Sequence, residues 1–337
     1  MTILALENVC QHYSIKKAGW WRANSHVLKA VDGVSLEIHQ GETVAVVGES
    51  GCGKSTLGRV ASLLETPTSG TVIFNEVTTE GLHGQALRHL RRQLGLVFQD
   101  PYSAMNPRLP IGELVGEPLA AHNIGNKETR HKKVLEALEA VGLGEDVINR
   151  YPHEFSGGQR QRICIARALV LDPELIIADE PLSALDVSVQ SQILNLFVEL
   201  KRTRNLAILF ISHDMAVVNY LADTIVVMYL GKVVEQAPRA SFFSHAAHPY
   251  SQALLAAVPK LGAGKRKRGL ALQGDVPSPI NPPSGCAFHP RCNKATDKCR
   301  TIEPVSNAFN NNETHRVACH YPDESVITAS AYSEVSE

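Results

Sequence analysis

The residues best suited to chemistry begin with a glycine-rich run at 48–56, which reads Gly-Glu-Ser-Gly-Cys-Gly-Lys-Ser-Thr. It lies between a short apolar run, Thr43–Val47, and a segment with helical patterning. Backbone N–H groups of such a turn, with the N-terminus of the following helix, surround phosphate oxygens. Lys54 is placed to reach β- and γ-phosphates, and the Ser55 hydroxyl to ligate Mg²⁺. The run therefore predicts a nucleoside triphosphate site, whose binding residues would be Gly48, Ser50, Gly51, Cys52, Gly53, Lys54, Ser55 and Thr56.

Two carboxylates follow an apolar strand predicted at 175–178. Asp179 ends that strand, where a carboxylate can hold Mg²⁺ through water. Glu180 comes next and would sit beside the γ-phosphate, placed to orient and deprotonate an attacking water. The alternative is an acidic strand end without chemistry, and the phosphate loop upstream favours the catalytic interpretation.

A serine–glycine turn opens another predicted helix, at 157–171. The turn consists of Ser156, Gly157, Gly158 and Gln159, and a helix N-terminus of this kind binds anions. It lies about a hundred residues beyond the phosphate loop, too far along the chain to duplicate that loop.

These motifs, in this order and spacing, resemble the ATP-binding subunits of ABC transporters from about Leu4 to Val234. The resemblance implies an α/β P-loop NTPase fold with an antiparallel β subdomain and a helical insertion. It also implies that the serine–glycine turn of one subunit closes over the γ-phosphate held by the other. The family usually has leucine at the position of Phe155. This difference exchanges one apolar side chain for another.

The resemblance assigns further roles by position. Tyr13 matches the aromatic residue that stacks on adenine; otherwise it is a half-buried strand tyrosine. Gln99 matches the glutamine that senses Mg²⁺ and the γ-phosphate and leads into the contact with the membrane subunit. His213 matches the histidine that contacts the γ-phosphate, and Ser183 and Asp186 lie in the loop that couples the two sites across a dimer. The implied Mg²⁺ ligands are Ser55, Gln99 and Asp179, and the implied catalytic residues are Glu180, His213 and Gln99.

Composition limits the remaining possibilities. The 337 residues allow one large domain with a smaller appendage, and the net charge of −1 gives no basic excess for nucleic acid. No apolar run approaches the roughly 20 residues that span a bilayer, which predicts a cytosolic protein that reaches a membrane through partners. We expect a nucleotide-binding domain at 1–240 with a helical subdomain near 101–170, an extension at 241–325, and a disordered tail at 326–337.

Three segments refine the resemblance toward importer ATPases for oligopeptides and dipeptides, above all the dipeptide-transport ATPases: Asp100–Arg108, Tyr151–Arg162 and His248–Tyr250. By this resemblance the partners are a second, non-identical ATPase, two membrane permeases and an extracytoplasmic peptide-binding protein. The expected place is the cytoplasmic face of a bacterial inner membrane. Relatives that carry nickel, glutathione, murein peptides or antimicrobial peptides share most of these segments. A soluble ATPase acting on DNA or ribosomes is a remote alternative. Such proteins have a long coiled coil or tandem ATPase units, whereas this sequence has one ATPase unit with a short helical insertion.

Four cysteines gather near the C-terminus: Cys286, Cys292, Cys299 and Cys319. Four thiolates can close a tetrahedral zinc site or hold an iron–sulfur cluster. Paired C-x2-C motifs typical of zinc ribbons are absent from this sequence. Peptide-importer ATPases are associated with a four-iron cluster on such cysteines, so the resemblance favours [4Fe–4S] and leaves Zn²⁺ as the alternative. His289, His315 and His320 are possible substitute ligands.

Overall fold

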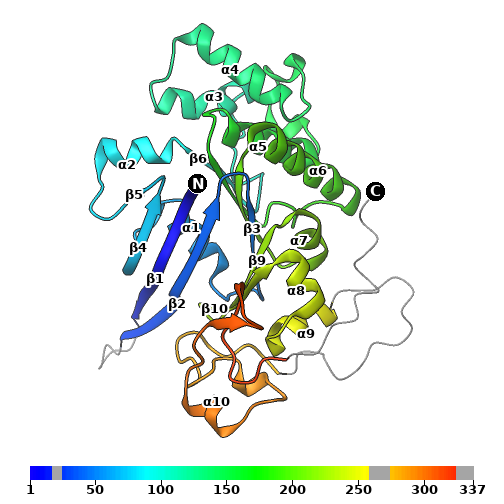
Figure 1. Ribbon diagram of the computed structural model, residues 1–337. Helices are drawn as coiled ribbons and strands as arrows, with labels where there is room; N and C mark the ends of the chain where they lie inside the picture. Colours follow the sequence, from blue (N-terminus) through cyan, green and yellow to red (C-terminus); the bar gives the residue numbers. More distant parts are fainter. Residues whose placement is uncertain (17–24, 258–273, 324–337) are drawn as a thin grey trace.

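The computed structural model describes residues 1–16, 25–257 and 274–323. Figure 1 shows two sheets side by side, a group of helices at one end and the C-terminal segments at the other. The tail expected at 326–337 and part of the extension expected at 241–325 lie outside the described residues. Within the described residues, no helix combines the length and the apolar character that crossing a bilayer requires.

The smaller sheet is antiparallel, with the strand order β2-β1-β4-β5. Its strands are β1 (Thr2–Lys16), β2 (Ser25–His39), β4 (Ser69–Phe74) and β5 (Val77–Thr78). The short helix α2 (Gly84–Arg91) follows this sheet in the chain. The antiparallel β subdomain expected from the sequence is therefore present.

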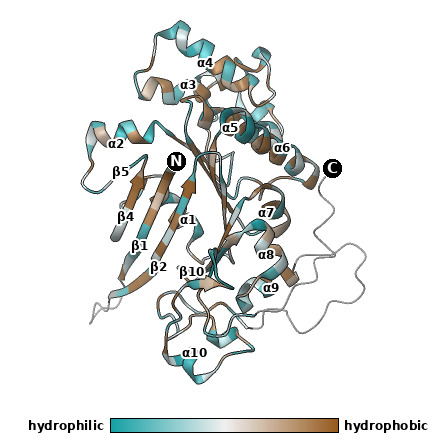
Figure 2. Ribbon diagram, in the orientation of Figure 1, coloured by the Kyte–Doolittle hydropathy of each residue, from teal (hydrophilic) through white to brown (hydrophobic). Residues whose placement is uncertain are grey.

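The larger sheet has the order β11-β12-β10-β9-β3-β8-β7-β6. Its parallel part comprises β3 (Thr43–Val47), β6 (Leu94–Val97), β7 (Leu175–Asp179), β8 (Ala207–Ser212) and β9 (Thr224–Tyr229). Strands β3 and β8 are buried along their whole length, as expected for a parallel sheet covered on both faces. Figure 2 shows the strands of this sheet coloured largely as hydrophobic, while helices such as α4 and α10 contain many hydrophilic residues.

Helix α1 (Lys54–Ala61) lies between the two sheets and contacts β1, β2, β7 and β8. Its Leu57 and Val60 are fully buried in the core that the sheets share. At Gly58, an added Cβ would come within 2.8 Å of the Ile211 side chain, so the helix packs closely on β8. This packing fixes the start of α1, where the glycine-rich loop ends.

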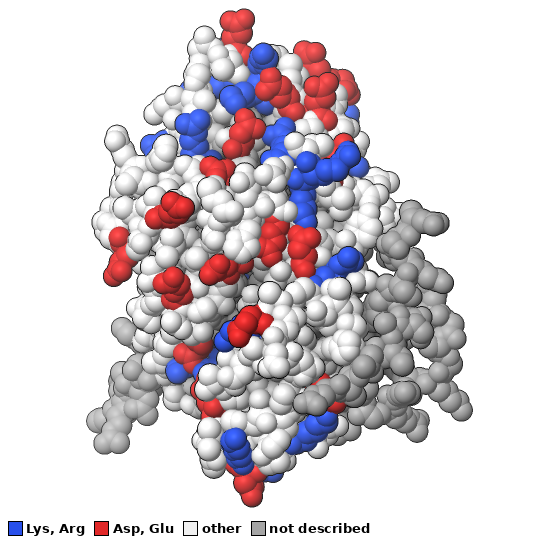
Figure 3. All heavy atoms as spheres, viewed as in Figure 1, with Lys and Arg blue, Asp and Glu red and all other residues white. Residues whose placement is uncertain are grey.

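The helical end of the molecule carries α3 (Ile111–Ala121), α4 (Lys127–Glu139), α5 (Gly157–Leu169) and α6 (Val187–Arg204). Helices α3, α4 and α5 contact one another, and α5 also contacts α6 and β6. The helical insertion expected from the sequence is present. Figure 3 shows acidic and basic side chains interspersed over the drawn face, in keeping with a net charge of −1.

The C-terminal segments continue the larger sheet. Helices α7 (Met215–Leu221), α8 (Arg239–His245), α9 (Pro249–Ala257) and α10 (Asp297–Thr301) accompany strands β10 (Lys232–Pro238), β11 (Asn307–Phe309) and β12 (Asn312–Val317). Strand β12 pairs with β10, and the buried Glu235 on β10 accepts a hydrogen bond at 2.8 Å from His315 on β12. Strand β12 is thereby joined to the rest of the larger sheet by both a strand pair and a buried polar contact.

Candidate functional site

The glycine-rich loop joins β3 to α1, and its backbone admits only glycine at two points. Gly48 has φ +155, and an added Cβ would lie 2.3 Å from the carbonyl oxygen of Met228. Gly53 has φ +107, and an added Cβ would lie 2.0 Å from the carbonyl oxygen of Ala30. The loop therefore has the tight backbone that a phosphate cradle requires.

Two side chains from the start of α1 point back to the loop and to the end of β7. The buried Lys54 ammonium donates to the carbonyl oxygens of Gly48 at 2.8 Å and Glu49 at 3.1 Å. The Ser55 hydroxyl donates to Asp179 at 3.1 Å. The structure thus brings the phosphate loop to the carboxylate predicted to share Mg²⁺ with it.

Glu180 lies at the centre of the predicted reacting groups. The Gln99 amide donates to its carboxylate at 3.3 Å, and His213 Nδ1 lies 3.3 Å from the same oxygen. The Lys54 ammonium is 4.0 Å from the other carboxylate oxygen. Glu180 itself has φ +46, an uncommon conformation for a side chain of this kind and a form of local strain seen at functional sites. Four residues predicted from separate motifs therefore converge.

The environment of Asp179 suits a cation. Burial raises the pKa of this carboxyl, and the neighbouring Glu180 charge acts in the same direction, while the Ser55 hydrogen bond opposes both. A divalent cation bound here would stabilise the ionised form, so this position favours metal binding on electrostatic grounds.

Tyr13 lies on β1 and faces the helix that follows the phosphate loop. Its hydroxyl donates to Glu65, whose carboxylate also accepts from Arg59 of α1 at 2.6 Å. The ring is half-buried. Tyr13 is therefore fixed beside the nucleotide loop, although the two are far apart in the sequence.

The serine–glycine turn lies on a different element from the Glu180 group. Ser156 caps α5, accepting from the Gln159 N–H at 3.4 Å, while the Gln159 side chain accepts from the Ser156 N–H at 3.1 Å. Ser156 and Gly157 are exposed, and Gly158 packs against Val189 of α6. The turn is therefore preformed and faces solvent.

The loop after Glu180 connects this group to α6. Ser183 donates through its hydroxyl to the Glu180 carbonyl oxygen at 3.0 Å, and Asp186 immediately precedes α6. Both side chains are exposed. The loop is thereby linked to the backbone of Glu180 by a hydrogen bond.

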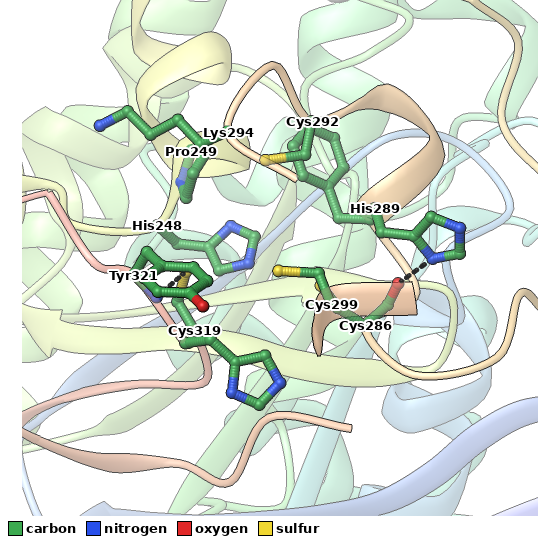
Figure 4. Close-up of a pocket in the computed structure, with 11 residues that line it drawn as sticks. His248, Pro249, Cys286, His289, Cys292, Lys294, Cys299, Cys319 and Tyr321 are labelled. Carbon is green, nitrogen blue, oxygen red and sulfur yellow. Dashed lines mark hydrogen bonds between the residues drawn. The ribbon is translucent and has the colours of Figure 1, made fainter. Parts of the chain in front are cut away.

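The four late cysteines line one pocket, together with His248 and Phe288 (Figure 4). A tetrahedral zinc site holds its sulfur atoms about 3.8 Å apart. Among the described residues, the three ligand atoms found within 4.8 Å of one another belong to Cys10, His12 and Asp32, not to the pocket cysteines. The pocket thiols are thus spaced too widely for a preformed zinc site. At the Cys10 group, the Lys29 and Lys232 ammoniums, each 3.3 Å from Asp32, already supply positive charge.

Burial in the pocket also affects the ionisation of its side chains. Burial raises the pKa values of Cys286 and Cys292 and raises that of Cys319 to about 11. Burial lowers the pKa of His248 to about 4, so its ring is neutral. His248 Nδ1 accepts the Tyr250 N–H at 3.0 Å, which leaves the proton on Nε2, a buried atom without a hydrogen-bond partner. Four thiols can ligate a cation once they are deprotonated, and the unpartnered N–H of His248 can donate to an acceptor such as a sulfur atom.

Two of the three histidines considered as substitute ligands, His289 and His320, line the pocket, and one ring nitrogen of each contacts a backbone oxygen. His289 Nδ1 lies 3.0 Å from the Cys286 carbonyl oxygen, and His320 Nε2 lies 2.8 Å from that of Ile302. His315 is paired with the buried Glu235 and does not line the pocket. Sequence reasoning missed His248, which lines the pocket and whose Nε2 has no hydrogen-bond partner, although the His248–Tyr250 motif had been noted.

Sequence reasoning also missed the contact of the extension with the phosphate loop. Arg291 forms two hydrogen bonds with the Glu49 carboxylate, and the Tyr250 hydroxyl accepts the Glu49 N–H. The signal was weak, because Arg291 is distinguished in the sequence only by preceding Cys292.

Comparison with known families gives two matches along the chain. The model described as "ABC transporter" matches residues 31–183. The model described as "Oligopeptide/dipeptide transporter, C-terminal region" matches residues 234–299, which include three of the four pocket cysteines.

Curated relatives cover nearly the whole chain. The dipeptide transport ATP-binding protein DppF of Escherichia coli is 47% identical over 294 residues, covering 87% of this chain and 87% of its own. The oligopeptide transport ATP-binding protein AppF of Bacillus subtilis is 47% identical over 323 residues, covering 95% and 97%. Among solved structures, the dimeric ATP-binding cassette MJ0796 in a post-hydrolysis state with ADP and phosphate has a TM-score of 0.62 at 33% identity. It covers 70% of this chain and 99% of its own.

Proposed function

Because the chain belongs to the ATP-binding subunits of ABC transporters, in their oligopeptide and dipeptide branch, we propose that it powers the import of dipeptides and other short peptides. As a member of this family it uses ATP and Mg²⁺, couples hydrolysis to transport, and works at the membrane with permease subunits. The observation that carries ATP hydrolysis is the convergence of Lys54, Gln99 and His213 on Glu180, whereas the peptide cargo rests on the relatives.

We assign the steps of hydrolysis to this group. Lys54 and the loop amides would hold the phosphates, while Ser55, Gln99 and Asp179 would hold Mg²⁺, which would neutralise charge on the phosphate oxygens. Glu180 accepts a proton from the attacking water and orients it toward the γ-phosphate. His213 would contact the γ-phosphate, and Tyr13 would stack on adenine. The contacts of 3.3 Å from Gln99 and His213 to Glu180 support these roles.

The exposed serine–glycine turn supports a dimeric cycle. Ser156–Gln159 of one subunit would close over the γ-phosphate held by its partner, and Ser183 and Asp186 would couple the two sites. The similar cassette MJ0796 is dimeric in a post-hydrolysis state with ADP and phosphate, which supports a dimeric cycle. Hydrolysis then weakens the closed dimer, and the segment after Gln99 transmits the movement to the permeases.

Cargo and assembly follow from the relatives. The partners we propose are a second, non-identical ATPase subunit, two permeases and an extracytoplasmic peptide-binding protein, with this chain on the cytoplasmic face of the inner membrane. Names of the relatives include both dipeptide and oligopeptide transport. Importers of nickel, glutathione, or murein and antimicrobial peptides remain the alternative cargo class, because specificity resides in the other subunits.

We further propose that Cys286, Cys292, Cys299 and Cys319 hold a [4Fe–4S] cluster. The wide spacing of the thiols and the free N–H of His248 support a cluster over Zn²⁺. Such a centre would supply cross-links that a small segment with little core of its own needs to stay folded. We also propose that the chain divides into a nucleotide-binding domain at 1–240 and an extension at 241–325, in keeping with the two family matches at 31–183 and 234–299.

Reconstitution with the permeases tests the function. We expect ATP hydrolysis by the purified subunit to rise at least tenfold in the assembled complex with loaded binding protein, because closure of the dimer is driven through the permeases. Addition of duplex DNA or ribosomes in place of the permeases should leave the rate unchanged. Stimulation by DNA or ribosomes alone would overturn the transport assignment and support the soluble alternative.

A further inference from the structure

Glu49, the second residue of the phosphate loop, is held by the C-terminal extension at two points. The Arg291 guanidinium donates to its two carboxylate oxygens at 2.6 and 3.1 Å, a bidentate pair. The Tyr250 hydroxyl accepts the Glu49 N–H at 2.8 Å. One loop residue is therefore fixed through both its backbone and its side chain by residues more than 200 positions away.

Burial makes this contact stronger than an ordinary surface pair. The Arg291 side chain is 5% exposed and that of Glu49 is 26% exposed. The guanidinium also lies over the Tyr229 ring, 6.0 Å from its centroid, on strand β9 beside the loop. Charges this shielded from water interact strongly, and removing one leaves the other uncompensated.

The charge of Glu49 affects phosphate binding because this residue lies on the phosphate loop. A carboxylate on the phosphate loop repels the phosphates that the loop has to bind, and here the Arg291 charge cancels it. The Lys54 ammonium donates to the Glu49 carbonyl oxygen at 3.1 Å, so the same residue also contacts the loop's principal phosphate ligand. The position of Glu49 consequently bears on both the charge and the shape of the loop.

The two residues that contact Glu49 are close in sequence to residues of the cysteine pocket. Tyr250 comes two residues after His248, and Arg291 directly precedes Cys292; His248 and Cys292 line the pocket. Figure 4 shows both of these residues in the pocket wall. The two residues that hold Glu49 therefore belong to the segments that form the pocket wall.

We propose that Arg291 and Tyr250 are positioning residues for the phosphate loop, through which the extension sets the affinity of the site for ATP. Arg291 neutralises Glu49, and Tyr250 fixes its backbone N–H. The inference rests on the proposed phosphate-binding role of residues 48–56, but it is independent of the transported cargo and of whether the pocket holds a metal.

Substituting either member of the ion pair should change the Kd for ATP differently. In titrations of the full-length subunit with a fluorescent ATP analogue and Mg²⁺, Arg291→Met should raise the Kd about tenfold, because Glu49 is left as an uncompensated negative charge. Glu49→Gln should leave the Kd unchanged or lower it, because Arg291 remains as a positive charge. The double variant should return to within about threefold of wild type, since the two effects share one partner.

The control is Arg300→Ala, which removes an exposed arginine of the same extension and should leave the Kd unchanged. Glu49→Gln does not alter the extension, so its outcome is informative even if Arg291→Met folds poorly. A rise in Kd of similar size for both single variants, without recovery in the double variant, would show a merely structural bridge and overturn the proposal. An unchanged Kd for Arg291→Met would also overturn it. Failure of the wild type to bind the analogue would instead contradict the proposed function itself.

Discussion

Glu180→Gln should lower the rate of ATP hydrolysis in the assembled transporter by at least about 100-fold, which corresponds to roughly 3 kcal/mol of transition-state stabilisation. The amide keeps the size of the side chain and can still contact Gln99 and His213, each now 3.3 Å from the carboxylate. It cannot accept a proton from water. Single-turnover and steady-state ATPase assays would measure the loss.

ATP binding by this variant should be retained. The carboxylate contributes negative charge near the phosphates, so its removal does not oppose binding. Glu199→Gln, an exposed glutamate on α6, is the matched control and should behave as wild type in both assays. Hydrolysis by Glu180→Gln at a rate close to wild type would exclude Glu180 as the general base.

Cys299→Ser should remove most of the iron from anaerobically purified protein and lower its thermal stability. Cys299 is buried in the pocket, and its carbonyl oxygen accepts the Cys286 N–H at 2.8 Å, so two of the proposed ligands are joined there. Losing a centre that links these segments should lower the Tm by roughly 5–10 °C, as expected for a few kcal/mol of metal-linked stability. Iron, sulfide and zinc analysis with differential scanning calorimetry would measure both effects.

Cys10→Ser provides the control, since Cys10 is half-buried on β1 and lies outside the pocket. It should leave the iron and sulfide content unchanged. Stoichiometric zinc without sulfide in the wild type would contradict the [4Fe–4S] assignment and favour the zinc alternative.

Local motifs were the part of this molecule that the sequence could predict. The glycine-rich loop depends on backbone conformations that its own residues determine, and Gly48 and Gly53 do adopt them. The same holds for the capping of α5 by Ser156, where the partner is three residues away. The family resemblance extended this to the Glu180 group, whose members come from distant strands.

Long-range pairing was beyond the sequence. The short strands β11 and β12 carry weak patterning, and their attachment to β10 depends on partners about 80 residues away. Likewise, nothing in the local sequence indicates that Arg291 should meet Glu49, because that contact forms only when the extension folds against the loop. The cysteines could be recognised as one group, but their separation, which bears on the metal, needed coordinates.

The central claim is that this chain supplies the energy for dipeptide uptake. Its most direct test compares uptake of labelled dipeptide, nickel and longer peptides in cells that lack other peptide importers and carry either the wild type or Glu180→Gln. We expect Glu180→Gln to abolish dipeptide uptake and to leave nickel uptake intact. Undiminished dipeptide uptake would contradict the dipeptide assignment, even though the chain would still be an ABC transporter ATPase.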